Sequence, residues 1–156
     1  MSKISPFLWF DDQAEEAVNF YLSVFKNAKP GPVSRYGDAG PGPKGQVMVA
    51  SFELDGITFN ALNGGPLYKF TEAISFQVNC ENQAEVDELW DKLTAGGEPG
   101  PCGWLKDKFG VSWQIVPAAL PRLIGNPDPA KAKRATEAML KMGKLDIAAL
   151  EAAAAG

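Results

Sequence analysis

Residues 7–25 read FLWFDDQAEEAVNFYLSVF, and their outline returns at residues 77–95 as QVNCENQAEVDELWDKLTA. The block Gln13-Ala14-Glu15 recurs as Gln83-Ala84-Glu85, in the same place of each stretch. A repeated unit that cannot bury its apolar face alone normally packs against its twin. The repeat therefore predicts one domain with pseudo-two-fold symmetry, built from two related modules.

The first copy predicts a strand, a helix and three further strands. Residues 4–10 are an apolar run of strand length, and Asp12 is the expected N-cap of the helix that follows. Apolar residues then recur at steps of three and one, which is typical of a helix that lies on a sheet. After a short strand, residues 46–54 and 57–62 flank Asp55-Gly56, a strong signal for a two-residue hairpin turn.

The second copy repeats that order. Residues 74–80 are predicted to form a strand, and Asn82 takes the place of Asp12 at the start of the helix. Residues 99–102 leave room for a short strand. The last two strands are then joined through Phe109-Gly110.

The resulting fold class is α+β: two paired βαβββ modules that form a curved mixed sheet, followed by C-terminal helices. We expect a single domain over residues 1–156. Its parts are module 1 at about 3–66, a linker at 64–72, module 2 at about 73–117 and a helical tail at 118–156.

Composition excludes several classes of function. The net charge is −4, and the basic residues of 131–134 are expected on a solvated helix face, so nucleic acid is not an expected partner. No apolar stretch approaches the ~20 residues that span a bilayer, and the N-terminus does not resemble a signal peptide. We therefore expect a cytoplasmic protein without a membrane partner, in which Cys80 and Cys102 are reduced.

Four segments of the chain match the sequences of a known protein group. They are Pro6–Phe10 with Ala14–Ala17, Ala61–Pro66, Cys102–Asp107 and Val111–Gln114. In these segments, and in its twofold βαβββ order, the chain resembles the vicinal oxygen chelate superfamily, which includes glyoxalase I, extradiol dioxygenases and bleomycin-resistance proteins. Within it, the chain is similar to the PhnB-like group, many members of which carry the name 3-demethylubiquinone 3-methyltransferase.

The resemblance leaves open whether the chain is an enzyme. The group's name implies a methyltransferase. However, the sequence contains no strand followed by a Gly-rich, helix-opening turn of the dinucleotide or S-adenosylmethionine type. We therefore expect no such cofactor.

Alternation along the strands separates two faces of the predicted sheets. One face is almost wholly apolar and is expected beneath the helices: Ile4, Leu8, Phe10, Ile57, Phe59, Ala61, Ile74, Phe76, Val78, Cys80, Val111, Trp113 and Ile115. The opposite face mixes neutral polar groups with rings and carries no charge: Ser5, Phe7, Trp9, Thr58, Asn60, Leu62, Ser75, Gln77, Asn79, Ser112, Gln114 and Val116. This composition favours a ligand-lined concave face over a solvated surface or a dimer contact.

The superfamily resemblance also points to four positions where its enzymes hold a divalent metal. These positions carry Ser5, Asn60, Ser75 and Gln114 in this chain, which has no histidine at all. Catalytic metals prefer imidazole or carboxylate ligands, whereas two hydroxyls and two amides hold a metal poorly. We expect no metal site and no catalytic residue.

The leading interpretation is a metal-independent protein that binds a small organic molecule, in the manner of the bleomycin-resistance proteins, and forms a homodimer. The expected binding residues are Ser5, Phe7, Trp9, Asn60, Ser75, Gln77 and Gln114. The alternatives are an enzyme of the metal-dependent lyase, isomerase or dioxygenase type, a methyltransferase, and a dimeric interaction module. The sequence leaves open whether the modules pair within one chain or between two.

Five further residues bear on the site. Cys80 lies on the apolar face, which favours a buried structural thiol over a nucleophile. Asp107 is expected to be an ordinary hairpin charge between two lysines. Tyr36, Asn63 and Trp104 are candidates for the border of the pocket, and the sequence does not decide between them.

Overall fold

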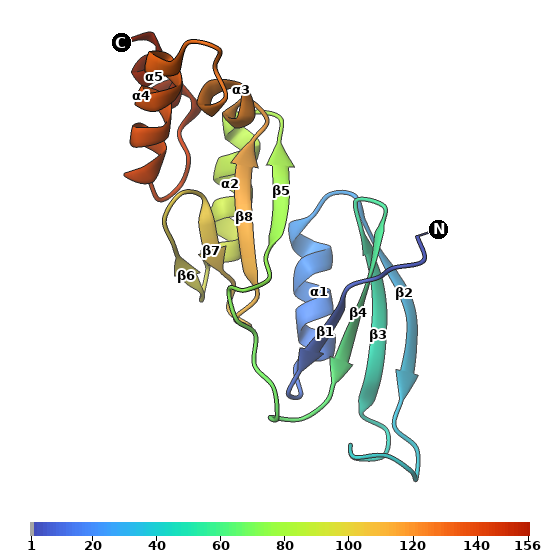
Figure 1. The fold of residues 1–156 in the computed structure, drawn as a ribbon. Coiled ribbons are helices and arrows are strands. Elements are labelled where there is room, and N and C mark those ends of the chain that lie inside the picture. The colour runs from blue at the N-terminus through green and yellow to red at the C-terminus, as the bar shows by residue number, and fades with distance from the viewer. Residues whose placement is uncertain (1) are drawn as a thin grey trace. The chain divides into compact units, whose positions relative to one another are not determined.

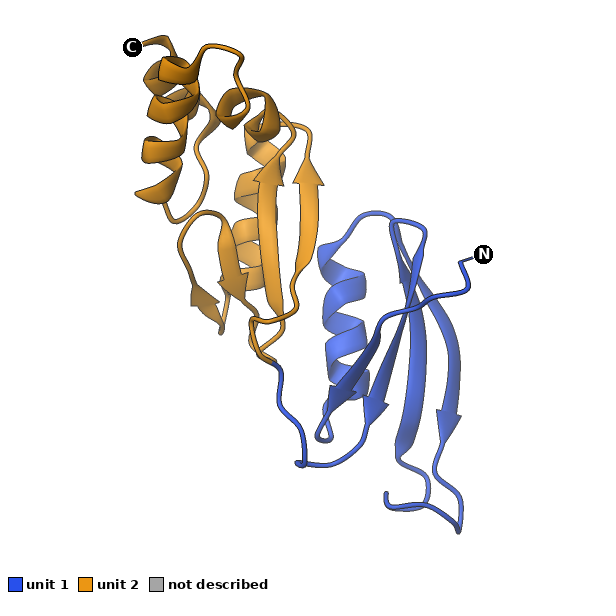
Figure 2. Ribbon diagram, in the orientation of Figure 1, with its two compact units in different colours: residues 1–70 blue, residues 71–156 orange. Residues whose placement is uncertain are grey.

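The computed structural model describes residues 2–156 and divides into two compact units, with the boundary along the chain between Phe70 and Thr71 (Figure 2). We call residues up to Phe70 unit 1 and Thr71–Gly156 unit 2. In each unit, a strand is followed along the chain by a helix and then by three more strands (Figure 1). The α+β class and the twofold βαβββ order are therefore confirmed.

Unit 1 is a four-stranded mixed sheet covered on one face by a helix. Its strands are β1 (Phe7–Phe10), β2 (Ala28–Arg35), β3 (Val47–Leu54) and β4 (Ile57–Asn63), and its helix is α1 (Ala14–Val24). The strand order is β1-β4-β3-β2, in which β1 runs parallel to β4 and the other pairs are antiparallel. The buried side of α1 packs against this sheet through Ala14, Ala17, Val18, Tyr21 and Val24.

Unit 2 repeats this sheet and adds a helical tail. Its strands are β5 (Phe76–Cys80), β6 (Glu98–Pro99), β7 (Trp104–Lys106) and β8 (Ser112–Pro117), in the order β5-β8-β7-β6. The helix α2 (Gln83–Thr94) covers one face. The tail contains α3 (Leu120–Ile124), α4 (Pro129–Leu140) and α5 (Ile147–Ala155), which share a cluster of buried apolar side chains.

The apolar face predicted from alternation forms the core in both units, except at its ends. Leu8, Phe59 and Trp113 are buried as expected. Three isoleucines assigned to this face are instead exposed: Ile4, Ile57 and Ile74. Ile4 and Ile74 precede the first residues of β1 and β5, and Ile57 directly follows a turn, so the helices do not reach them.

Two tight turns have positive φ at both central residues, the signature of a type I′ hairpin turn. One is the predicted Asp55-Gly56 turn, with φ of 49° and 82°. The other is Cys102-Gly103, with φ of 58° and 84°, where the Trp104 N–H donates to the Pro101 carbonyl at 3.0 Å. The sequence did not predict this second turn.

A Pro-Gly-Pro motif occurs at the outer strand of each unit, at residues 30–32 and 99–101, and unit 1 has a further copy at 41–43. A Cβ atom on Gly31 would lie 2.9 Å from the Ser51 carbonyl oxygen, and one on Gly100 would lie 2.8 Å from that of Trp104. Real Cβ atoms do not approach backbone so closely. Glycine is therefore required where the chain at the outermost strand of each sheet comes close to the neighbouring strand.

The tail is fastened to the Cys102-Gly103 turn by backbone hydrogen bonds. The N–H of Cys102 donates to the Met142 carbonyl, and that of Gly103 donates to Gly143, both at 2.8 Å. The Gln83 side chain, at the start of α2, donates to the Leu145 carbonyl and accepts from the N–H of Ile147. The tail therefore packs on unit 2. Within residues 2–156, no helix combines the length and apolar character needed to cross a membrane.

The start of α1 is capped differently from the prediction. Gln13, not Asp12, holds the N-cap position. The N–H of Ala14 donates at 2.8 Å to Oδ1 of Asn63, a residue 4% exposed at the end of β4, whose Nδ2 donates to the Val47 carbonyl. In α2 the predicted cap is confirmed, because Oδ1 of Asn82 accepts from the Glu85 N–H.

This difference predicts unequal stability effects for two asparagines. Asn63→Ala leaves a buried donor and a buried acceptor without partners, so we expect the free energy of unfolding to fall by about 2–4 kcal/mol. The exposed cap change Asn82→Ala is expected to lower it by about 1 kcal/mol. Urea denaturation followed by circular dichroism measures both, and equal losses would contradict the assigned role of Asn63.

Candidate functional site

In unit 1, the predicted site residues Phe7, Trp9 and Asn60 lie on the open face of the sheet. Phe7 and Asn60 are partners in the parallel register of β1 and β4, and Oδ1 of Asn60 accepts a 2.6 Å hydrogen bond from Ser51 Oγ on β3. Phe7 is 57% exposed. Ser5 is also exposed and lies just before β1, where the N–H of Asn60 donates to the Pro6 carbonyl.

Trp9, also on this face, is already engaged within unit 1. Its indole Nε1–H donates to the Gly65 carbonyl at 2.8 Å, and the ring of Tyr68 meets it edge-on at 4.9 Å. A Cβ on Gly64 would fall 2.4 Å from the indole, so glycine is needed for this close packing. Trp9 therefore holds the segment after β4 against the sheet.

In unit 2, the open face brings the other predicted site residues together. Gln77, Gln114 and Trp104 are register partners across β5, β8 and β7, so they form one row. Nε2 of Gln114 donates to Ser75 Oγ at 2.9 Å, and Nε2 of Gln77 donates to Oδ1 of Asn79 at 2.8 Å. Ser75, Gln77 and Gln114 therefore lie close together on this face.

The open faces are not free of charge, contrary to the sequence interpretation. The prediction considered only the strands that became β1, β4, β5 and β8, whereas β3 adds Glu53 and β7 adds Lys106. Glu53 is the register partner of Lys29 on β2, with 3.9 Å between the charged groups. Lys106 is the register partner of Glu98 on β6.

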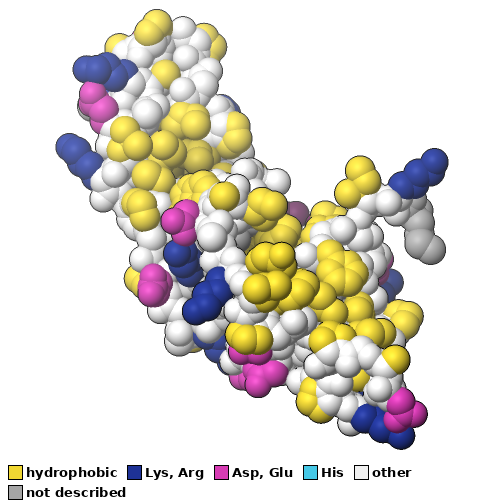
Figure 3. Space-filling model, turned by 60° about the horizontal axis from the view of Figure 1, so that its bottom comes forward, with side chains coloured by type: hydrophobic (Ala, Val, Ile, Leu, Met, Phe, Trp, Pro, Cys, Tyr) yellow, Lys and Arg dark blue, Asp and Glu magenta, His cyan; other side chains and the backbone are white. Residues whose placement is uncertain are grey.

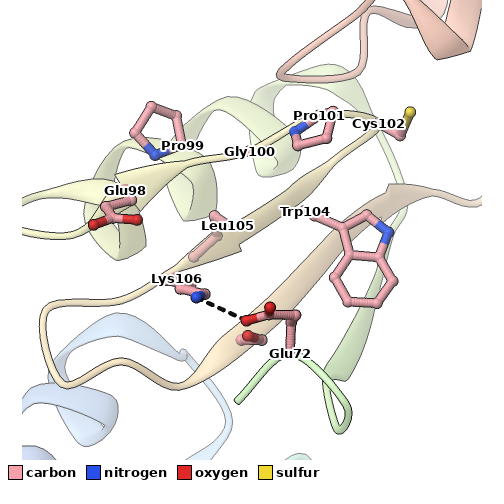
Figure 4. Close-up of a pocket in the computed structure, with 10 residues that line it drawn as sticks. Glu72, Glu98, Pro99, Gly100, Pro101, Cys102, Trp104, Leu105 and Lys106 are labelled. Carbon is pink, nitrogen blue, oxygen red and sulfur yellow. Dashed lines mark ion pairs between the residues drawn. The ribbon is translucent and has the colours of Figure 1, made fainter. Parts of the chain in front are cut away.

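A groove of about 420 Å³ lies beside the Gln114 row, within unit 2 (Figure 4). Its walls are mainly apolar and include the Trp104 indole, Leu105 and the rings of Pro99 and Pro101. Charged side chains stand at its lip: Glu72, Glu98 and Lys106. Ser112, the β8 partner of Lys106, completes the lining.

Ser112 is the most informative side chain of the groove. It is 2% exposed, and among residues 2–156 its Oγ has no hydrogen-bond partner. The other buried polar side chains, Asn63 and Asp107, are bonded. Asp107 accepts from the N–H groups of Phe109 and Val111 and from the Trp113 indole. Asp107 is therefore a buried anchor of the β7–β8 hairpin, and the expectation of an ordinary hairpin charge was wrong.

An ion pair lies at the lip next to Ser112. The Lys106 Nζ is 2.8 Å from a carboxylate oxygen of Glu72, and both side chains are substantially exposed. The hydrogen bond from Lys106 lowers the pKa of Glu72, and the same bond raises the pKa of Lys106. Both groups are therefore charged at neutral pH.

The donor set does not fit a divalent metal. The four positions implied by the superfamily resemblance hold hydroxyls and amides, and Ser75 and Gln114 bond to each other. Within residues 2–156, no cluster of three or more His, Cys, Asp or Glu side chains could hold a metal ion. We derive no metal-dependent step from this site.

The two candidates for the pocket border in unit 1 have structural roles. The Tyr36 hydroxyl donates to the Asn63 carbonyl at 2.6 Å, and both residues are buried. Trp104, the third candidate, lines the groove. The sequence interpretation missed Glu72, Lys106 and Ser112. The Pro-Gly-Pro motif at 99–101 borders the groove, but the same motif also occurs at 30–32 and 41–43, so the motif alone does not mark the site.

Other parts of the surface also expose large hydrophobic side chains, including Leu67 and Leu140. Figure 3 shows hydrophobic side chains at several places on one face, with charged side chains between them. Exposed apolar atoms are normal on soluble proteins, so this distribution alone does not mark a site.

Comparisons with known proteins agree with the fold. The model of a family described as 3-demethylubiquinone-9 3-methyltransferase matches residues 2–116, which ends before the helical tail. The structure titled putative 3-demethylubiquinone-9 3-methyltransferase, PhnB protein, from Bacillus cereus is 39% identical, covers 75% of this chain and 100% of its own, and has a TM-score of 0.68. The search of curated proteins gave no match.

More distant structures share the fold alone. Protein PA1353 from Pseudomonas aeruginosa is 21% identical over 75% of this chain and 98% of its own, with a TM-score of 0.60. The fosfomycin resistance protein FosX from Listeria monocytogenes, complexed with Mn(II) and sulfate, is 19% identical over 78% of this chain and 94% of its own. Its TM-score is 0.53, which supports a glyoxalase-like fold for this chain.

The two cysteines are predicted to differ in reactivity. Burial raises the pKa of the Cys80 thiol to about 12 and removes it from solvent, whereas Cys102 is partly exposed. At pH 8 only about one Cys80 in ten thousand is a thiolate, which is the reactive form. We expect a dithiobis-nitrobenzoate reagent to modify one thiol rapidly in the native protein, and none rapidly in Cys102→Ala. Rapid labelling of Cys102→Ala, with Cys80→Ala as control, would contradict this.

Proposed function

This chain belongs to the family described as 3-demethylubiquinone-9 3-methyltransferase, and we propose that it binds a small organic molecule without using a catalytic metal. The proposed binding surface is the open face of each sheet. In unit 1 it comprises Ser5, Phe7, Trp9 and Asn60, and in unit 2 Ser75, Gln77 and Gln114. In unit 2 the groove beside Trp104 extends this surface.

The observation that carries the proposal is the chemistry of the unit 2 face. A row of neutral amides borders a mainly apolar groove, as expected for a pocket that combines apolar contact with a few polar groups. A volume of about 420 Å³ is within the range of pockets that accept small molecules. Phe7 offers an exposed ring in unit 1.

Metal independence follows from the ligands available rather than from the fold. FosX from Listeria monocytogenes was crystallised with Mn(II), so the fold is compatible with a metal centre. In this chain the four positions that the superfamily resemblance implies for a metal are serine, asparagine and glutamine, and histidine is absent from the sequence. Such neutral oxygen and amide groups bind Mn²⁺ or Zn²⁺ weakly compared with imidazole and carboxylate.

The name of the family suggests an alternative function, that of a methyltransferase, which can be tested by experiment. A methyltransferase must bind its methyl donor, and S-adenosylmethionine is the candidate donor. Saturable binding of S-adenosylmethionine would favour the transferase over the binding protein. A homodimer and a cytoplasmic location also stay predictions from the sequence.

Binding can be tested with 3-phenylpropan-1-ol, a neutral probe that fits the groove. Ligand efficiency for a molecule of this size suggests a Kd of about 1 mM. We expect saturable shifts of the Trp104 indole N–H in NMR spectra, assigned with Trp104→Phe. Gln114→Leu should weaken binding about fivefold, since one hydrogen bond is lost. Ser23→Ala, on the exposed side of α1, is the control. No saturable shift, or equal affinity in Gln114→Leu, would contradict the proposal.

The metal prediction has its own measurement. Titration of the purified protein with MnCl₂ and ZnCl₂ is expected to show no stoichiometric site, because the neutral donor set provides little affinity. Cys102→Ala serves as a control for zinc bound by the exposed thiol. A one-to-one site that disappears in Gln114→Leu but persists in Cys102→Ala would establish the metal-dependent alternative instead.

A further inference from the structure

We propose that the unit 2 groove is a carboxylate-binding site, in which the chain's own Glu72 holds the place that a ligand carboxylate takes. The ligand class is a molecule with a flat apolar body and one carboxylate. Its carboxylate replaces Glu72 at Lys106 Nζ and accepts the hydrogen bond of Ser112 Oγ. This inference deepens the proposed function and rests on it, because it names the ligand class for that same face.

The first argument is the unsatisfied hydroxyl. Buried polar atoms are nearly always hydrogen-bonded, so each exception needs an explanation. Ser112 Oγ is such an exception, and Ser112 belongs to the lining of a groove. A hydroxyl donates most strongly to a charged acceptor, and a carboxylate is the charged acceptor that Lys106, its register partner, also attracts.

The row of side chains that crosses the open face differs between unit 1 and unit 2. The counterpart of the Glu98–Lys106–Ser112 row is Lys29–Glu53–Thr58, which has the same register across three strands. There the cation and the carboxylate belong to the sheet itself, and Thr58 is exposed. In unit 2 the signs are exchanged, the serine is buried, and Lys106 pairs with Glu72 from outside the sheet.

The exchange of carboxylates is energetically easy. The side chains of Lys106 and Glu72 are 40% and 67% exposed, and ion pairs this exposed contribute little to stability. Replacing one carboxylate by another keeps the charge balance around Lys106. The ligand also gains the bond to Ser112 and contact with Trp104 and the two prolines, which Glu72 does not provide.

A cationic ligand fits the same groove less well. Its charge would face Lys106, the residue adjacent to Ser112 in the register. It could approach Glu98, but it would leave the pair between Glu72 and Lys106 in place. When Glu72 moves aside, Lys106 and Glu98 remain at the edge of the groove, and their charges sum to zero before a ligand anion binds.

Three probes with one phenylpropyl body test the ligand class: 3-phenylpropanoate, 3-phenylpropan-1-ol and 3-phenylpropylammonium. We expect the carboxylate to bind the full-length protein at least fivefold more tightly than the alcohol, and the ammonium to bind most weakly. Affinities are read from the Trp104 indole N–H shift at constant pH and ionic strength. Equal affinities, or tighter binding of the ammonium, would overturn the carboxylate assignment.

Variants at the lip test the mechanism of exchange. Glu72→Gln removes the internal competitor and should tighten 3-phenylpropanoate binding about threefold to fivefold, since an exposed ion pair no longer has to be broken. Lys106→Met should weaken it more than tenfold, and Ser112→Ala about fivefold. Glu16→Gln makes the same change in net charge on the exposed surface of α1 and is expected to leave the affinity unchanged.

The outcomes separate this inference from the proposed function. If 3-phenylpropanoate binds Glu72→Gln no more tightly than the wild type, or gains the same affinity in Glu16→Gln, the proposed exchange of Glu72 for a ligand carboxylate is overturned. Saturable binding of the alcohol would in that case still support the small-molecule site. Absence of saturable binding for all three probes, in the wild type and in Glu72→Gln, contradicts both. Ser112→Ala keeps the fold if its circular dichroism spectrum matches the wild type, so a loss of affinity then reports on the site.

Discussion

A polar atom removed from water needs a partner inside the protein, and this constraint organises both units. Asn63 meets it in unit 1 by joining the start of α1, the end of β4 and the backbone of β3. Asp107 meets it in unit 2 by closing the β7–β8 turn and binding the Trp113 indole. Ser112 is buried to a similar degree without such a bond, and it lies in a groove. Asn63 and Asp107 therefore stabilise the fold, whereas we assign Ser112 to ligand binding.

Duplication explains why the two units share one βαβββ architecture although their buried polar residues have different roles. Equivalent hydrogen bonds fix the end of the last strand in each unit, from Gly64 N–H to the Phe10 carbonyl and from Ala118 N–H to the Cys80 carbonyl. A Pro-Gly-Pro motif occurs at the outer strand of each unit. On this common frame the cross-strand charges changed sign, so that unit 2 presents a lysine on its open face where unit 1 presents a glutamate.

The fold could be predicted from the sequence because its signals are local and repeated. Helix periodicity, the Asp55-Gly56 turn and the Asn82 cap each depend on residues close together in the chain, and all are confirmed. The Asp12 cap failed because the true partner of the α1 N-terminus, Asn63, lies far along the sequence. Ile4 and Ile74 were placed in the core by alternation alone, which says nothing about where a strand begins.

The candidate site was only partly predictable for the same reason. Strand alternation placed Ser75 and Gln114 on the same face, and they share a hydrogen bond. The groove depends on Glu72, which reaches Lys106 from outside the sheet, and on the burial of Ser112. Neither property follows from strand alternation. The sequence interpretation placed Ser112 on the correct face but gave no reason to separate it from its neighbours.

A crystal structure of the protein with 3-phenylpropanoate tests the central claim most directly. The account predicts the probe's carboxylate within hydrogen-bond distance of both Ser112 Oγ and Lys106 Nζ, its ring beside Trp104, and Glu72 turned away from Lys106. A structure in which Glu72 keeps its bond to Lys106 while the probe binds elsewhere would contradict it. So would an ordered water that satisfies Ser112 in the presence of the probe.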